Sequence, residues 1–271
     1  MIEFFKSKLT SAKSKADTPR VPEGTRVYAI GDVHGCADLL ASLAAAIDEE
    51  IDADRSEGVE THIVLLGDLV DRGPDSAGVV EFARKWRKRR SVRVLWGNHE
   101  EMFVRAFEDK DVLKHFLRFG GRETLMSYGV DRKAFSKSSL EEIQAMMEEV
   151  VPAKHRKFIA KFEDMIQFGD YLFVHAGIKP GVALDKQKKR TLRWIREPFL
   201  SHADSFGPVV VHGHTITDAP DNAGNRIGID TGAYASGKLT ALVLEGRKLR
   251  YITARESKKG GIVVDGAKVP A

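Results

Sequence analysis

The chain has 271 residues, a net charge of +4 and a single cysteine, Cys36. One cysteine excludes a disulfide framework and a cysteine-based zinc knuckle. The length suits one large domain or two small ones, and a chain of this size can bury about 75% of its unfolded surface. No run of about 18 apolar residues occurs, which excludes a membrane-spanning helix. Because the N-terminus also has no secretory-signal pattern, we expect a cytoplasmic protein without a membrane partner.

Composition changes along the chain predict four segments. Residues 1–24 form a flexible basic tail, 25–253 form the folded domain, and 254–271 form a loose C-terminal tail that includes a Lys-Lys-Gly-Gly run. Within the domain, residues 103–163 are charged, have helical periodicity and contain no strand signal. We therefore expect a helical insertion there.

Short apolar runs alternate with predicted helices before the insertion and follow one another after it. The early runs end at a glycine and precede a helix, which predicts βαβ units, and their continuous apolar character indicates a sheet covered on both faces. A Gly169-Asp170 turn predicts a hairpin after the insertion. These patterns indicate an α/β fold. The predicted strands are 27–30, 63–66, 92–96, 165–168, 171–174, 209–211, 226–229, 239–244 and 249–252.

Side chains of metal-binding types follow five of these strands. Ligands in open α/β folds collect where strands end and loops begin. Carboxylate, imidazole and amide oxygen donors together suit a borderline divalent metal such as manganese, iron or zinc. Each group alone could be a turn with an incidental acid, but five groups that each close an apolar run favour a site. The residues are Asp32, His34, Asp68, Asn98, His99, His175 and His214.

The motifs around these residues resemble those of a known family. They are Gly31-Asp32-Val33-His34-Gly35, Gly67-Asp68-Leu69-Val70-Asp71-Arg72-Gly73, Gly97-Asn98-His99-Glu100, His175-Ala176-Gly177 and His212-Gly213-His214-Thr215. Their order over residues 25–253 is similar to the calcineurin-like metallophosphoesterases, and within them to the bacterial phosphoprotein phosphatases. Ile216 stands where many other branches have a second histidine, which favours this branch.

The resemblance implies a fold and a cofactor. The fold is a four-layer α-β-β-α arrangement, a β-sandwich flanked by helices, and the cofactor is a pair of divalent metal ions. We expect manganese, with iron or zinc as alternatives. By matching position, the first metal takes Asp32, His34 and Asp68, and the second takes Asp68 as a bridge together with Asn98, His175 and His214.

Four residues near these ligands carry candidate catalytic and substrate-binding roles. His99 follows a metal ligand and is the candidate general acid, and Asp71 could orient its imidazole. Arg72 offers a bidentate guanidinium to phosphate oxygens. Arg196 lies in a segment similar to the one that supplies a second phosphate-binding arginine in the family.

Three functions fit these residues. The first is a serine/threonine protein phosphatase that acts on phosphorylated protein or peptide by direct attack of a metal-bridging hydroxide. The second is a symmetrical bis(5'-nucleosyl)-tetraphosphatase acting on a dinucleoside polyphosphate, and the third is an inactive phosphate-binding regulatory protein. Residues 230–241 resemble bacterial protein phosphatases, which favours the first, and retention of all the ligands argues against the third.

Two other segments bear on partners. The basic run 84–90 fits the solvated end of a helix better than a nucleic-acid site, so we expect no stable nucleic-acid partner. The insertion should lie over or beside the metals and discriminate between substrates, because it separates the Asn98-His99 loop from His175 in the sequence. Its candidate contacts to a peptide or a base are Arg105, Arg118, Arg122 and Tyr128.

Overall fold

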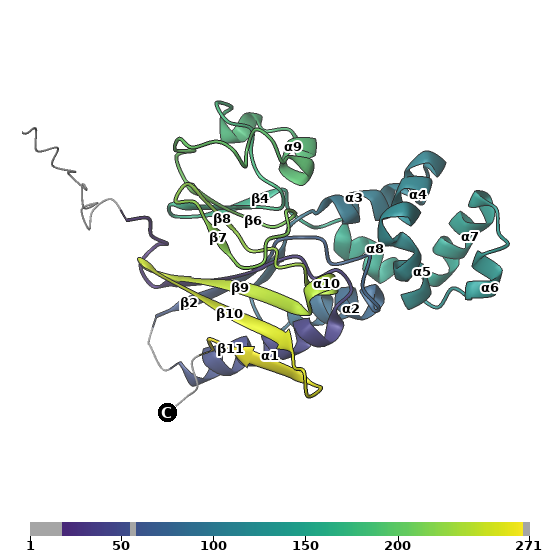
Figure 1. Ribbon diagram of the computed structural model, residues 1–271, viewed down its shortest axis with the longest axis horizontal. Helices are drawn as coiled ribbons and strands as arrows, with labels where there is room; N and C mark the ends of the chain where they lie inside the picture. Colours follow the sequence, from purple (N-terminus) through teal and green to yellow (C-terminus); the bar gives the residue numbers. More distant parts are fainter. Residues whose placement is uncertain (1–17, 55–57, 268–271) are drawn as a thin grey trace, which may run out of the picture.

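The computed structural model describes residues 18–54 and 58–267, which form two β-sheets stacked face to face with helices outside them (Figure 1). One sheet has the strand order β11-β10-β9-β1-β2-β3 and the other the order β4-β5-β6-β8-β7. The strands are β1 (Thr25–Ile30), β2 (Glu60–Leu65), β3 (Val92–Val94), β4 (Met165–Phe168), β5 (Tyr171–Val174), β6 (Val209–His212), β7 (Asp221–Asn222), β8 (Arg226–Gly228), β9 (Lys238–Glu245), β10 (Lys248–Glu256) and β11 (Ile262–Asp265).

Helices cover the outer faces and one end of the sandwich (Figure 1). They are α1 (Ala37–Ala53), α2 (Ser76–Trp86), α3 (Asn98–Arg105), α4 (Lys110–Phe116), α5 (Arg122–Ser127), α6 (Arg132–Phe135), α7 (Leu140–Val150), α8 (Ala153–Ile159), α9 (Lys189–Trp194) and α10 (Ala233–Ser236), with a π-helical turn η2 (Leu117–Gly121) and a 3-10 turn η3 (Leu184–Lys186). Within the described residues, no helix is both long and apolar enough to cross a membrane.

Three apolar clusters hold the layers together. The cluster between the sheets joins the inward faces of both, for example Val64 and Leu242 with Phe173 and Val211. A second cluster packs α1 and α2 on the outer face of the larger sheet, and a third packs Leu192 of α9 on the smaller one. Sheets covered on both faces need apolar side chains on both faces of each strand. This arrangement confirms the predicted four-layer α/β fold.

The direction of the strands determines where the loops meet. β1, β2 and β3 are mutually parallel, and so are β5, β6 and β8. Parallel neighbours end at the same edge of a sheet, so the loops that follow them gather there. The five groups of polar residues predicted at strand ends therefore come together at one edge of the sandwich.

Residues 103–163 are helical and continue the core of the larger sheet. Phe103 is fully buried, and its ring centroid lies 5.5 Å from that of Phe107, 5.6 Å from that of Phe116 and 6.1 Å from that of Tyr128. The α5 and α8 helices both pack on α2. The insertion therefore shares one apolar core with the sheet domain.

The two ends of the chain differ from the expected tails. Residues 1–17 of the basic tail lie outside the described residues, but Val21 is fully buried and its amide donates to the Gly246 carbonyl. The segment 254–271, expected to be loose, contains the end of β10 and the whole of β11, which pairs with β10. Gly260 and Gly261 have positive φ and make the turn between these strands. The expectation of a loose segment was wrong because strand pairing depends on contacts that a local pattern does not contain.

Phe103→Ala should lower the free energy of unfolding by about 3–5 kcal/mol, because it leaves a cavity among three aromatic neighbours. Urea denaturation followed by circular dichroism measures this change. Val263→Ala is the matched control: Val263 is 39% exposed, so its loss should change stability by no more than about 0.5 kcal/mol. Since the insertion shares the core of the sheet domain, the unfolding curve should remain a single transition, and a separate transition for the insertion would contradict this.

Candidate active site

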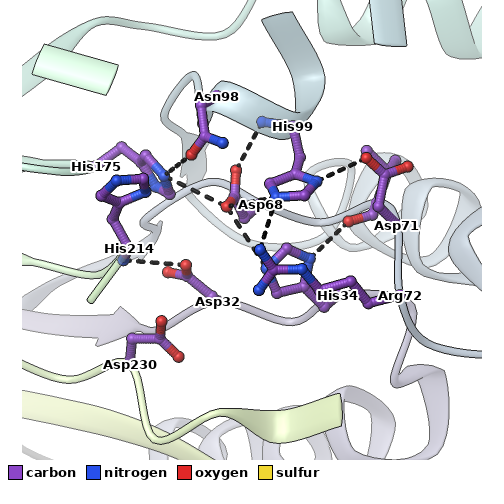
Figure 2. A network of polar contacts seen from close by, with 12 residues as sticks. Asp32, His34, Asp68, Asp71, Arg72, Asn98, His99, His175, His214 and Asp230 are labelled. Atoms are coloured by element: carbon purple, nitrogen blue, oxygen red, sulfur yellow. Dashed lines mark hydrogen bonds and ion pairs between the residues drawn. The ribbon is translucent and has the colours of Figure 1, made fainter. Parts of the chain in front are cut away.

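The predicted ligands lie together at the edge where the parallel strands end (Figure 2). Asp68 is at the centre. Its Oδ2 lies 3.5 Å from His34 Nε2, 3.9 Å from His99 Nε2 and 3.4 Å from His175 Nε2. Its Oδ1 accepts a hydrogen bond from the His99 amide at 3.0 Å. One carboxylate oxygen of Asp68 is thus held by the backbone while the other faces the histidines.

Among the residues that the structure describes, two groups of buried side chains could hold a metal ion, and Asp68 belongs to both. The first group is His34, Asp68 and His99, and the second is Asp68, His175 and His214. Within each group the candidate ligand atoms lie within 4.8 Å of one another. A carboxylate shared by two adjacent groups fits a bridging ligand between two metals, as the sequence predicted for Asp68.

The hydrogen bonds of His34 leave one of its ring nitrogens available for a metal. His34 Nδ1 lies 2.8 Å from the Val70 carbonyl, which makes it the donor and leaves Nε2 with a lone pair. His34 Nε2, His214 Nε2 and Asp32 Oδ1 are buried without a hydrogen-bond partner among the described residues. Buried polar atoms without a partner are costly. These three orphaned atoms are among seven such atoms in the described residues, and all three belong to predicted metal ligands, so the residues present fit a metal site.

The pKa shifts of His34, His214 and Asp32 also fit a metal site. Burial lowers the pKa of His34 and of His214 to about 3, so both imidazoles are neutral and able to coordinate a metal. Burial raises the pKa of Asp32, and the nearby carboxylates of Asp230 and Asp68 raise it further. Three buried carboxylates this close need a compensating positive charge, which divalent cations supply.

The backbone holds this cluster in conformations that residues other than glycine rarely adopt. Among the described residues, the non-glycine residues with positive φ are His34, Asp68, Asp71, Arg72 and His214, with φ between 45° and 74°. Such conformations cost on the order of 1–3 kcal/mol each and persist where surrounding contacts enforce them. Gly97 shows how close the packing is: a Cβ there would lie 2.0 Å from Asp68 Oδ1.

His99 is bonded at both ring nitrogens, unlike His34. Its Nδ1 lies 2.6 Å from Asp71 Oδ2, and its Nε2 accepts from Arg72 Nη2 at 3.1 Å. Burial lowers the pKa of His99, but the charges of Asp68 and Asp71 outweigh this, so the net pKa is raised. His99 therefore forms a hydrogen-bonded group with Asp71 and Arg72, and it also lies beside the candidate metal ligands.

Several residues that position the site were given no role by the sequence. Glu100 Oε2 accepts from the Asp68 amide at 2.8 Å and Glu100 Oε1 from the Leu69 amide at 2.7 Å, so this carboxylate shapes the Asp68 turn. Thr124 in α5 donates to Asp71 Oδ1 at 2.6 Å. Glu100 stands in the Gly-Asn-His-Glu motif, which could have drawn attention to it, whereas Thr124 carries no local signal.

The remaining predicted residues divide between the site and the core. The positive charge of Arg196 contributes, after burial and His175, to the lowered pKa of His214, so Arg196 lies within electrostatic reach of the cluster. Tyr128, expected to contact substrate, instead packs against Phe103 and bonds His155 Nδ1 through its hydroxyl at 3.0 Å. That expectation was wrong because Tyr128 belongs to the core of the insertion.

Comparison with known proteins agrees with this geometry. Residues 25–239 match the family model described as calcineurin-like phosphoesterase. A relative from Oceanobacillus iheyensis, named bis(5'-nucleosyl)-tetraphosphatase PrpE [asymmetrical], is 27% identical over 259 residues, covering 85% of this chain and 93% of the relative. The protein of the same name from Bacillus subtilis (strain 168) is 27% identical over 238 residues, with 78% and 87% covered.

Solved structures show the same fold. One of a candidate diadenosine tetraphosphatase has a TM-score of 0.56 and 20% identity, covering 91% of this chain and 97% of the other. One of a cold-active protein tyrosine phosphatase from a psychrophilic Shewanella has a TM-score of 0.50 and 19% identity, covering 90% and 83%. Since the family model spans most of the sequence and the resemblance of the motifs is thereby confirmed, the protein belongs to the calcineurin-like phosphoesterases and is a hydrolase of that metallophosphoesterase superfamily.

Proposed function

We propose that this protein is a two-metal hydrolase that cleaves dinucleoside tetraphosphates asymmetrically, into a nucleoside monophosphate and a nucleoside triphosphate. The observation that carries the proposal is the similarity to relatives named as asymmetrical tetraphosphatases over 85% of this chain and 93% of the relative. The relatives do not support the serine/threonine phosphatase preferred from the sequence, and they carry the asymmetrical name where the sequence suggested the symmetrical activity. The protein phosphatase and the symmetrical tetraphosphatase are therefore alternative outcomes of the substrate test below.

Two metal ions would be held by the residues predicted as ligands. His34 with Asp32 would hold one, His175 and His214 with Asn98 would hold the other, and Asp68 would bind both. The orphaned atoms of Asp32, His34 and His214 support this assignment. When bound, such a pair lowers the pKa of a water and neutralises charge on the phosphates.

Arg72 would bind a substrate phosphate, and His99 would transfer the proton. Arg72 donates to His99 Nε2 in this structure. A guanidinium pairs more strongly with phosphate oxygens than with a neutral imidazole, so a substrate phosphate would draw Arg72 away and leave Nε2 able to carry a proton. Asp71 at 2.6 Å from Nδ1 would hold the ring and stabilise the imidazolium until the leaving oxygen takes that proton.

Asp68→Asn should reduce the content of both metals, because Asp68 is shared by the two candidate groups. His34→Ala and His214→Ala should each reduce it by about one ion, and Asp38→Asn, an exposed acid of α1, should not change it. Elemental analysis after dialysis measures this. Chelation should abolish phosphoesterase activity and manganese should restore it. Full turnover of p-nitrophenyl phosphate by metal-free protein would contradict the assignment.

His99→Asn should keep the metal content and lower kcat by about 10²–10⁴-fold, the usual contribution of a positioned acid or base. The loss should be greater for phenyl phosphate than for p-nitrophenyl phosphate, because the more basic leaving group needs the proton more. Steady-state kinetics on both esters measures this difference, with His202→Asn as a control outside the cluster. Loss of metal from the His99 variant would show that His99 is a ligand instead.

The substrate test compares turnover of diadenosine tetraphosphate with that of phosphoseryl and phosphothreonyl peptides. We expect kcat/KM to be at least about tenfold higher for the dinucleotide, with AMP and ATP as products, since remote contacts separate substrates that share one phosphate chemistry. Chromatography of the products measures both. Two molecules of ADP would indicate the symmetrical activity, preference for the peptides would indicate a protein phosphatase, and no turnover with metal bound would indicate an inactive binding protein.

A further inference from the structure

A cavity of about 720 Å³ lies between α3, α4 and α9, and the metal ligands are not part of its lining. Met102 and Arg105 line it from α3, His115 from α4, and Arg190 and Trp194 from α9. None of these residues has a role in the proposed hydrolysis.

Two of the helices that line the cavity also lead to residues of the active site. The α3 helix begins with Asn98 and His99, so Met102 and Arg105 lie about 5 and 9 Å further along its axis. The α9 helix ends at Trp194, two residues before Arg196. A ligand with one end at His99 and Arg196 and an extended chain beyond them would therefore reach this cavity.

Three aromatic rings form a row beside the cavity. The ring centroids of Trp194 and His115 are 6.5 Å apart, and those of His115 and Phe119 are 4.5 Å apart. Phe119 is 40% exposed and lies in the π-helical turn η2. The next residue, Gly120, accepts a hydrogen bond from the Arg72 amide at 3.2 Å. The row thus runs from α9 to the backbone that touches Arg72, and aromatic rings of this kind can stack with a planar base.

The three acids in the wall of the cavity each have a partner. Glu101 accepts from Trp194 Nε1 at 2.7 Å, Asp111 pairs with Lys114 at 3.0 Å, and Asp109 is 3.4 Å from Arg105. Arg190 makes no ion pair with any residue that the structure describes, and its guanidinium is exposed at the rim. A polyphosphate that entered would meet Arg190 and could compete with Asp109 for Arg105.

We propose that this cavity binds the distal nucleoside of the substrate, with the base stacked on the His115–Trp194 side of the row and the phosphate chain passing Arg105 and Arg190. This rests on the proposed hydrolysis of dinucleoside tetraphosphates. A phosphoseryl peptide would gain little there, because it carries neither a planar base nor a chain of phosphates.

The first test is the Michaelis constant for diadenosine tetraphosphate in Trp194→Leu and His115→Ala. Each should raise KM about tenfold, the loss expected for one stacking contact, and leave kcat within about twofold. Both constants for p-nitrophenyl phosphate should remain unchanged. Trp194→Phe keeps a stacking surface and should stay close to the wild type. His202→Ala is the matched control, because His202 also packs beside a phenylalanine, Phe206 at 4.8 Å, away from the cavity.

The charge contribution has its own pair of variants. Arg190→Glu should raise KM for the dinucleotide and leave the ester unaffected, while Arg87→Glu, an exposed arginine at the end of α2, should change neither. Unchanged KM in both His115→Ala and Trp194→Leu would overturn the proposal. Equal losses on p-nitrophenyl phosphate would also overturn it, since these would reflect general damage to the fold.

A binding measurement separates this proposal from the proposed function. AMP added to metal-free protein should quench the fluorescence of Trp194, and the quenching should be absent from Trp194→Phe. If the wild type fails to hydrolyse the dinucleotide but AMP quenches Trp194, the proposed function fails and the base site stands. If the wild type hydrolyses the dinucleotide and AMP does not quench Trp194, the base site fails and the function stands.

Discussion

The shared carboxylate of Asp68 is the constraint on which the rest of the site depends. Its Oδ2 has three imidazole nitrogens within 3.9 Å, and Asp32 and Asp230 bring two more buried carboxylates close by. Burial raises the pKa of Asp68, but the charges of His175 and His99 more than reverse this and lower it well below its ordinary value. So much buried negative charge is tolerable only with cations beside it.

The surrounding structure holds Asp68 in place at a cost in local strain. The loops that carry the ligands adopt left-handed conformations at residues such as His34 and His214, and Glu100 binds the amides of the Asp68 turn. The insertion also contacts these residues. Thr124 donates a hydrogen bond to Asp71, and Gly120 lies so close to Arg72 that a Cβ on Gly120 would be 2.5 Å from the Arg72 backbone nitrogen. The helices 103–163 thus support the catalytic residues from one side and form a wall of the neighbouring cavity.

A feature could be predicted from the sequence when the residues that cause it are neighbours in the chain. The strands and the clustering of polar side chains at their ends could be predicted because apolar runs and the polar residues that end them are neighbours in the sequence. The motif around Glu100 could draw attention to it, but its partner could not be predicted, because its hydrogen bond reaches back more than 30 residues to Asp68. The packing of Tyr128 against Phe103 and the pairing of β11 with β10 depend on contacts between distant segments, and both were predicted incorrectly. The preference for a protein phosphatase was predicted from residues 230–241, whereas the aromatic cavity is built by α3, α4 and α9.

The central proposal is that Asp68 binds two metals, one with His34 and the other with His175 and His214. Anomalous diffraction from crystals grown with manganese tests it most directly. We expect two peaks on either side of Asp68 Oδ2, one within bonding distance of His34 Nε2 and the other within bonding distance of His175 and His214, with His99 bonded to neither. A single peak, or a metal coordinated by His99 Nε2, would contradict this assignment.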